Sequence, residues 1–284
     1  MKCALSTLCV MMLGLLACRS STEPASEVNN YPLSAGYVWN YTGQYATFNF
    51  RPLRQGATFR DTVIQWPAKA EIVGRAVLRD SIDTWKFRST TALSHTAFDE
   101  QYYLLNGDTL YQYAYRSGNL GFPKGFSPIR FVYQGRAFES LDEMFDVLTN
   151  GFPFNYGEPR ADSIVYELTP PRVLIFPVRD GLQWSYRPKG TPGGRIDKKV
   201  VGVEQIPLPA IIYSTHKIQW LWDLNQDDIW DTTLVGFDYI NAKGIIKRTF
   251  IFKDVEATSE QNPDEVIGLF DVKFEYLLKS HNIK

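Results

Sequence analysis

The feature that most constrains the fold is a strict alternation of apolar and charged residues close to the end of the sequence. Every second position there is apolar, namely Phe270, Val272, Phe274, Tyr276 and Leu278. The positions between them include Asp271, Lys273 and Glu275. Because successive side chains of a β-strand point to opposite faces, this pattern predicts a half-buried strand with one face toward water. A less regular version predicts an earlier strand, with Ile246, Arg248, Phe250 and Phe252 on one face.

Turn signals and composition extend this prediction to the whole chain. Residues 100–105 and 108–113 flank Asn106-Gly107, a pair that tolerates the positive φ of a type I′ turn, so we expect a hairpin. The 18 Phe, 16 Tyr and 7 Trp residues suit a pleated surface. The sequence therefore predicts an all-β, mainly antiparallel fold, built from two related curved sheets or half-barrels.

The two related units are suggested by an internal repeat. Residues 31–41 and 176–186 share the pattern aromatic-Pro-aliphatic-x-x-Gly-x-x-Trp-x-Tyr. Ile72-Val73-Gly74 then has a counterpart in Val200-Val201-Gly202. We interpret each copy as a Gly turn followed by a strand whose Trp and Tyr share one face. The alternative is chance similarity in a Trp-rich chain.

One short helix is expected between the repeats. Ser140 and Glu143 form a capping box, and the apolar residues Leu141, Met144, Phe145 and Leu148 fall on one face. Asn150-Gly151 ends this helix, which covers residues 141–149. We assign it to a first β unit of residues 31–165, followed by a second β unit of residues 166–284.

The start of the chain predicts an anchor. Lys2 precedes an uncharged apolar run over residues 4–16, which fits the core of a signal peptide of residues 1–17 and is too short to span a bilayer. Ala17-Cys18 then forms a lipobox, so we expect cleavage before Cys18 and acylation of that residue, for example with palmitate. Arg19 in place of Asp favours the outer membrane by resemblance to the Gram-negative sorting rule. Residues 18–30 are polar and are predicted to be a flexible tether. The alternative is an ordinary cleaved signal that contains a cysteine.

Composition excludes several classes of function. Without the leader, 29 basic residues face 31 acidic ones, so electrostatics give no support for nucleic acid as a partner. Cys3 and Cys9 leave with the leader, which removes any intrachain disulfide. No G-x-S-x-G elbow or H-E-x-x-H helix is present, and the three histidines are scattered. We therefore predict that the protein is not an enzyme.

A loop rich in oxygen side chains is the candidate metal site. Loop positions 1, 3, 5 and 9 are Asp223, Asn225, Asp227 and Asp231, and Ile229 at position 7 would supply a carbonyl. This spacing suits Ca²⁺, which takes six to eight oxygen ligands. The glycine and the final Glu of an EF-hand are missing, so the hypothesis is a calcium-binding hairpin loop. The alternative is an acidic turn without metal.

Three tryptophans surround this loop, namely Trp220, Trp222 and Trp230. Trp220 and Trp222 share one face of a predicted strand, which favours a core position. The alternative is an exposed aromatic platform that binds a sugar ring or a protein partner.

These motifs together resemble the uncharacterised secreted lipoproteins of the Bacteroidota and neighbouring phyla. The resemblance rests on the lipobox and on four segments, residues 31–41, 176–186, 201–210 and 244–248. It departs from the pattern at Ile211, where a glycine usually follows Pro-Ala. The resemblance implies curved half-barrels similar to those of lipoprotein and lipid carriers, and it implies no activity or catalytic residue.

The leading hypothesis is a non-enzymatic binding or envelope-support module anchored by its N-terminal lipid to the outer membrane, on its periplasmic or its surface face. Its partner would be a protein, a hydrophobic molecule or a glycan. One alternative is a periplasmic carrier of a lipid or other hydrophobe. Another is a carbohydrate-binding module with a structural Ca²⁺ as its cofactor.

Overall fold

The structure is a computed structural model of the 284-residue chain. It describes residues 21–23, 28–58, 60–92, 98–116, 131–133, 135–138, 164–191, 194–259, 262 and 264–284. The predicted helix over residues 141–149 and the anchor residue Cys18 lie outside these residues. No described helix is long and apolar enough to cross a membrane.

The described residues form strands joined by turns and loops. The strands of the first half are β1 (Ser21–Glu23), β2 (Val38–Pro52), β3 (Thr62–Leu78), β4 (Ile82–Thr91), β5 (Asp99–Asn106), β6 (Thr109–Arg116), β7 (Phe131–Tyr133) and β8 (Arg136–Phe138). Those of the second half are β9 (Val165–Tyr166), β10 (Arg172–Ile175), β11 (Gln183–Arg187), β12 (Arg195–Pro207), β13 (Ile211–Asp223), β14 (Leu234–Asn241), β15 (Gly244–Thr258) and β16 (Val266–His281).

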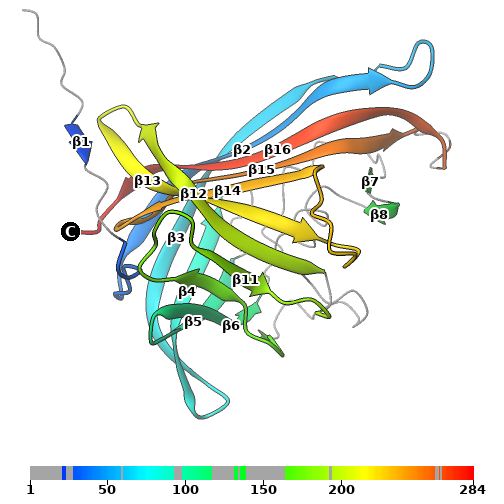
Figure 1. Ribbon diagram of the computed structural model, residues 1–284. Helices are drawn as coiled ribbons and strands as arrows, with labels where there is room; N and C mark the ends of the chain where they lie inside the picture. The colour runs from blue at the N-terminus through cyan, green and yellow to red at the C-terminus, as the bar shows by residue number, and fades with distance from the viewer. Residues whose placement is uncertain are drawn as a thin grey trace, which may run out of the picture.

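All these strands belong to one sheet, ordered β10-β6-β5-β4-β3-β2-β16-β15-β14-β13-β12-β11 along its main path. Neighbours on that path are antiparallel, while β1 pairs with β13 in parallel. The all-β, mainly antiparallel fold class is therefore confirmed, and strands from both predicted units join in one curved sheet (Figure 1). The sheet is not closed into a barrel, because no backbone ladder joins β10 to β11.

The predicted hairpin is present as β5 and β6, with a turn one residue later than expected. Asn106 pairs with Thr109, so the two turn residues are Gly107 and Asp108. Of these two, only Gly107 has a positive φ, 60°. A type II′ turn requires a positive φ at its first central residue alone, which glycine supplies at no steric cost.

The two repeat segments adopt the same local geometry. Gly36 has φ +84° and donates its N–H to the carbonyl of Ile72, while Gly181 has φ +78° and donates to the carbonyl of Val200. In both halves the register of the next pair of strands shifts at a glycine, Gly74 in β3 and Gly202 in β12. The shared pattern thus encodes a shared turn and bulge, while the division into two units at residue 165 stays a prediction.

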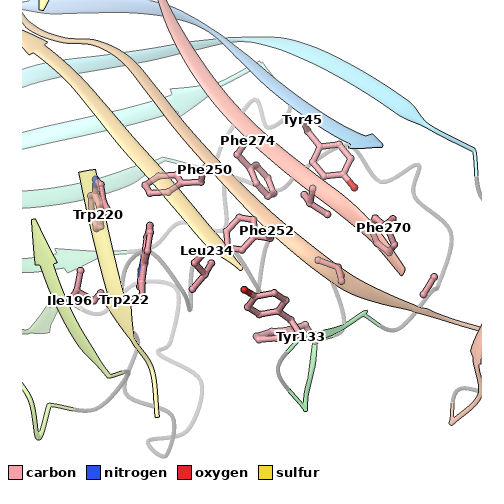
Figure 2. Packing of buried hydrophobic residues seen from close by; sticks show 14 of the residues in the cluster. Tyr45, Tyr133, Ile196, Trp220, Trp222, Leu234, Phe250, Phe252, Phe270 and Phe274 are labelled. Atoms are coloured by element: carbon pink, nitrogen blue, oxygen red, sulfur yellow. The ribbon is translucent and has the colours of Figure 1, made fainter. Parts of the chain in front are cut away.

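The largest apolar cluster lines one face of the sheet, here called the inner face. Rings from β13, β15, β16 and β2 follow one another along it, from Trp220 through Phe250 and Phe274 to Tyr45 (Figure 2). The hairpin of β7 and β8 joins the sheet where β7 pairs with β15, and it places Tyr133 edge-on to Phe252, at 6.1 Å between ring centres. The predicted apolar phase is confirmed at Phe270, Val272, Phe274 and Leu278, which are all buried, whereas Asp271, which was expected to face water, is buried as well.

The segment after the leader differs from a free tether at two places. Residues 21–23 pair with Ile211, Ile212 and Tyr213 as strand β1. Val28 is fully buried and bridges to Val178. The predicted tether of residues 18–30 is therefore fixed to the sheet before it reaches Asn30, because the apolar Val28 finds a place in the core.

Candidate functional site

The most unusual group on the inner face is a buried carboxylate with four donors around it. Asp238 of β14 lies directly opposite Arg248 of β15 and accepts from its Nε at 2.6 Å and its Nη2 at 3.2 Å. Trp220 Nε1 donates to Asp238 at 2.9 Å, and Lys198 Nζ lies 3.4 Å away. Burial raises the pKa of Asp238, and the neighbouring Arg248 and Lys198 more than offset this, so its pKa stays below the usual value. We call Lys198, Asp238 and Arg248 the inner cluster.

Lys198 is only 1% exposed and has weak polar contacts. Its other hydrogen bond, to the carbonyl of Val173 in β10, is also 3.4 Å long. The ammonium lies 3.8 Å from the ring centre of Trp220 and 4.7 Å from that of Tyr186. Burial lowers the pKa of Lys198 to about 8, although Asp238 acts in the opposite direction. Cation–π attraction to these two aromatic faces therefore adds to the weak polar contacts of this ammonium.

Arg248 is the accessible member of the inner cluster. Its side chain keeps 31% of its surface, against 4% for Asp238 and 1% for Lys198. Burial lowers the pKa of Arg248, and Asp238 more than offsets this effect. Tyr103 of β5 and Tyr186 of β11 are close enough to influence that pKa.

A cavity of about 430 Å³ opens where β2 begins and β16 ends. Its volume falls within the roughly 300–1,000 Å³ typical of small-molecule sites. The lining includes the apolar side chains of Leu33, Leu105 and Ile283, but more of the lined surface is polar than apolar. Tyr31 lines this cavity, and burial raises its pKa to about 12.

The predicted calcium loop uses its own carboxylates to hold the backbone. Asp223 is fully buried and accepts the N–H groups of Asp227 at 3.0 Å and Asp228 at 3.1 Å. Asp231 accepts the N–H of Leu224 at 3.0 Å. These bonds resemble the capping of a helix start, in which a carboxylate satisfies free N–H groups.

The remaining predicted ligands lie at the surface of the same loop. Asp227 accepts from Asn225 Nδ2 and from the N–H of Ile229, both at 2.9 Å. Ile229 is 69% exposed. Within the described ranges, no three His, Cys, Asp or Glu side chains are grouped so that they could hold a metal. The calcium hypothesis stays a prediction, and the loop already has a hydrogen-bonded structure without it.

The tryptophans near the loop do not form an exposed platform. Trp220 and Trp222 are 4% and 1% exposed and stack on each other at 5.7 Å between ring centres. Trp230 is half-buried, and the guanidinium of Arg195 lies 4.5 Å from its ring centre. The core interpretation of Trp220 and Trp222 is confirmed. This removes the aromatic surface on which the carbohydrate-binding alternative depends.

Reasoning from the sequence alone did not identify the inner cluster, although the sequence contains a signal for it. Asp238 lies between Gly236 and Ile240, and Arg248 between Ile246 and Phe250, at positions that face the core. A charged residue in the apolar phase of a strand predicts either a buried ion pair or a site. Partners from β12 and β14 are remote in sequence, so only the folded sheet shows that they meet.

Comparisons with known proteins give distant structural similarity. No protein-family model and no curated protein matches the chain. A Bacteroides fragilis protein with a YmcC-like fold, described as exported, has a TM-score of 0.34 and 11% identity, over 90% of this chain and 100% of its own. A Parabacteroides distasonis protein described as a lipoprotein has a TM-score of 0.31 and 9% identity, over 92% of this chain and 100% of its own. At these values neither structure assigns a family or a function to this chain.

Proposed function

We propose that this chain is a lipoprotein anchored to the outer membrane, and that it acts by binding a ligand or partner and not by catalysis. The observation that carries the proposal is the position of the anchor. The lipobox cysteine Cys18 comes three residues before β1, which pairs with β13. A chain of three residues spans at most about 11 Å. Acyl chains on Cys18 would therefore hold one defined end of the sheet at the bilayer.

The geometry of that end supports a binding role. The cavity near Tyr31 opens at the start of β2, and the β12–β13 turn lies at the same end of the sheet, next to β1 (Figure 1). A cavity close to a membrane is accessible to a ligand that partitions into lipid. This observation favours the carrier of a hydrophobe as the second candidate function.

The anchor is tested by mass spectrometry of the mature chain purified from membranes. We expect cleavage before Cys18, an acyl mass on that residue, and recovery of the protein with the outer membrane. The Cys18→Ser variant should lose the acyl mass and leave the membrane fraction. An unmodified Cys18 in a membrane-free protein would contradict the proposal. Turnover that a single carboxylate substitution abolishes would contradict the non-enzymatic role.

A further inference from the structure

Three cations of strands β4 and β6 share one carboxylate of β5. Arg88 of β4 and Arg116 of β6 lie directly opposite Glu100, one on each side, so these residues form a row across three strands. The Nη2 atoms of Arg88 and Arg116 lie 3.1 and 2.9 Å from the Glu100 carboxylate. Lys86 Nζ lies 2.7 Å from the same carboxylate. We call Lys86, Arg88, Glu100 and Arg116 the basic cluster.

The basic cluster has two more positive charges than its carboxylate can neutralise. Glu100 is the one carboxylate in the described chain within ion-pair distance of these three cations. Glu71 lies opposite Arg88 in β3, but it pairs with Lys69 at 2.5 Å and so leaves the surplus unchanged. Burial raises the pKa of Glu100, and hydrogen bonds from Lys86 and Arg88 more than offset this, so its pKa stays below the usual value. Because like charges held side by side repel, the need to neutralise Glu100 does not explain three cations.

The two guanidinium groups are held in place and still have unused donors. The Cζ atoms of Arg88 and Arg116 lie 4.6 and 4.8 Å from the ring centre of Phe98, so both groups stack on one ring. Each contacts Glu100 through Nη2, and neither Nη1 has an acceptor among the residues that the structure describes. Arg88 Nε is buried and likewise has no acceptor there, which is costly for a charged group. Donors on two fixed guanidinium groups are therefore left for a further acceptor.

The cations of the basic cluster are accessible from water, whereas its carboxylate is not. Lys86, Arg88 and Arg116 keep 24%, 33% and 25% of their side-chain surface, and Glu100 keeps none. We propose that the basic cluster binds a phosphate group with two negative charges, either as free phosphate or as the monoester head of a lipid. This inference rests on the proposed binding role and gives it a class of ligand.

The charge and the donors of the basic cluster favour this class of ligand. Three cations would repel a metal ion, and a neutral ligand would leave the surplus charge unchanged. A phosphate monoester carries about 1.5–2 negative charges at pH 7 and has three strong acceptor oxygens. These properties match the surplus charge and the three cationic side chains. Arginine suits this role, because its planar guanidinium matches the geometry of phosphate oxygens.

The test uses the mature chain with Cys18→Ser, which retains every described residue, at constant ionic strength. Calorimetry with inorganic phosphate measures binding of the free ion. Flotation with phosphatidylcholine vesicles measures binding of a headgroup, and these vesicles contain either phosphatidic acid, a monoester, or phosphatidylglycerol, a singly charged diester. We expect one phosphate per chain, or stronger retention on phosphatidic acid than on phosphatidylglycerol. Failure of both expectations would overturn the inference.

Two variants locate the site. Arg88→Gln and Arg116→Gln each leave two cations beside Glu100, so the fold should be preserved, which circular dichroism checks. Each variant should weaken the observed binding about tenfold, because it removes charge-assisted hydrogen bonds to the ligand. Binding that is unchanged in both variants would overturn the inference.

Arg75→Gln is the matched control for these variants. Arg75 lies over the ring of Trp85 at 4.6 Å, as the two cluster arginines lie over Phe98, but it pairs with a carboxylate of its own, Asp83. The same loss of charge should therefore leave phosphate binding unchanged, and an equal loss of binding would contradict a specific site. The anchor does not enter this assay, so either proposal can fail without the other.

Discussion

Arg172 and Trp184 join the two free edges of the sheet without a backbone ladder. Trp184 Nε1 donates to the carbonyl of Arg172 at 2.8 Å, and Arg172 Nε donates to the carbonyl of Ser185 at 3.0 Å. These bonds connect β10 and β11, the end strands of the path. These two side chains thus hold the seam of the curved sheet in place of a backbone ladder.

Removing the Trp184 donor should loosen this seam. In Trp184→Phe, the partly buried carbonyl of Arg172 loses this partner, which typically costs about 1–3 kcal/mol. We expect that decrease in the free energy of unfolding in urea, together with faster hydrogen exchange in β10 and β11. Trp39→Phe is the matched control, since Trp39 occupies the equivalent repeat position and donates to Lys243 at 2.6 Å, away from the seam. Equal exchange in β10 and β11 for both variants would show that Trp184 has no special role there.

The sequence predicted the strands well because local patterns determine them. The alternation around Phe274 and the glycine between β5 and β6 each act within a few residues. It did not predict that β16 pairs with β2, which joins the two halves in one sheet. That pairing joins residues more than 200 positions apart, and no periodicity within either strand specifies its neighbour.

The repeated glycine turn makes a quantitative prediction. Gly36 and Gly181 have φ values of +84° and +78°, and a Cβ at either position would meet no atom within 4 Å. The cost of Gly36→Ala and of Gly181→Ala is therefore conformational alone, about 1–2 kcal/mol each, and it should be similar at the two sites. Gly36→Asn should cost less, because Asn tolerates this region. Unfolding in urea measures all three. Costs that differ severalfold between Gly36→Ala and Gly181→Ala would argue against equivalent turns.

Lys198 should make stability depend on pH in a defined direction. Its pKa is about 8 in the folded chain and 10.5 in the unfolded chain, so between these values the unfolded chain binds more protons. Stability contributed by this residue therefore rises with pH above 8, by up to about 3 kcal/mol. Burial raises the pKa of Tyr31 to about 12, which lowers stability only above pH 10.

Comparison with Lys198→Met isolates this contribution, because Tyr31 is common to both proteins. The free energy of unfolding of the native chain minus that of Lys198→Met should increase from pH 7 to pH 10. A difference that stays constant over this interval would show that Lys198 does not lose its proton early in the folded state.

Substitutions in the acidic loop distinguish a structural role of its carboxylates from a role in binding calcium. Asp223 is buried and holds two backbone N–H groups, so Asp223→Ala should lower the free energy of unfolding by about 1–3 kcal/mol with or without calcium. Asp227 is exposed, so Asp227→Ala should cost less. The calcium hypothesis adds a distinct expectation, a stoichiometric calcium mass in native mass spectrometry that disappears with EDTA and in Asp227→Ala. If the mass of the protein shows no bound calcium in the presence of calcium, the loop is an acidic turn without metal.

The position of β1 predicts how the protein lies on the bilayer. Residues 206–215, around the β12–β13 turn, carry no charge, and Pro207, Pro209 and Ala210 are exposed. Because β1 starts three residues after Cys18 and pairs with the first residues of β13, this turn should reach the lipid headgroups. The mature chain has no other cysteine once Cys18 is acylated, so Pro209→Cys provides a single labelling site.

Fluorescence of an environment-sensitive label at that site measures the orientation in vesicles that contain spin-labelled lipid. We expect a blue shift and strong quenching at Pro209→Cys. Gly56→Cys, in the exposed loop between β2 and β3 at the opposite end of the sheet, should show neither. An added charge in Leu208→Asp should reduce quenching at position 209 while acylation keeps the protein in the vesicle fraction. Equal quenching at both positions would mean that the anchor does not orient the sheet, and it would remove the geometric reason for a cavity that opens toward lipid.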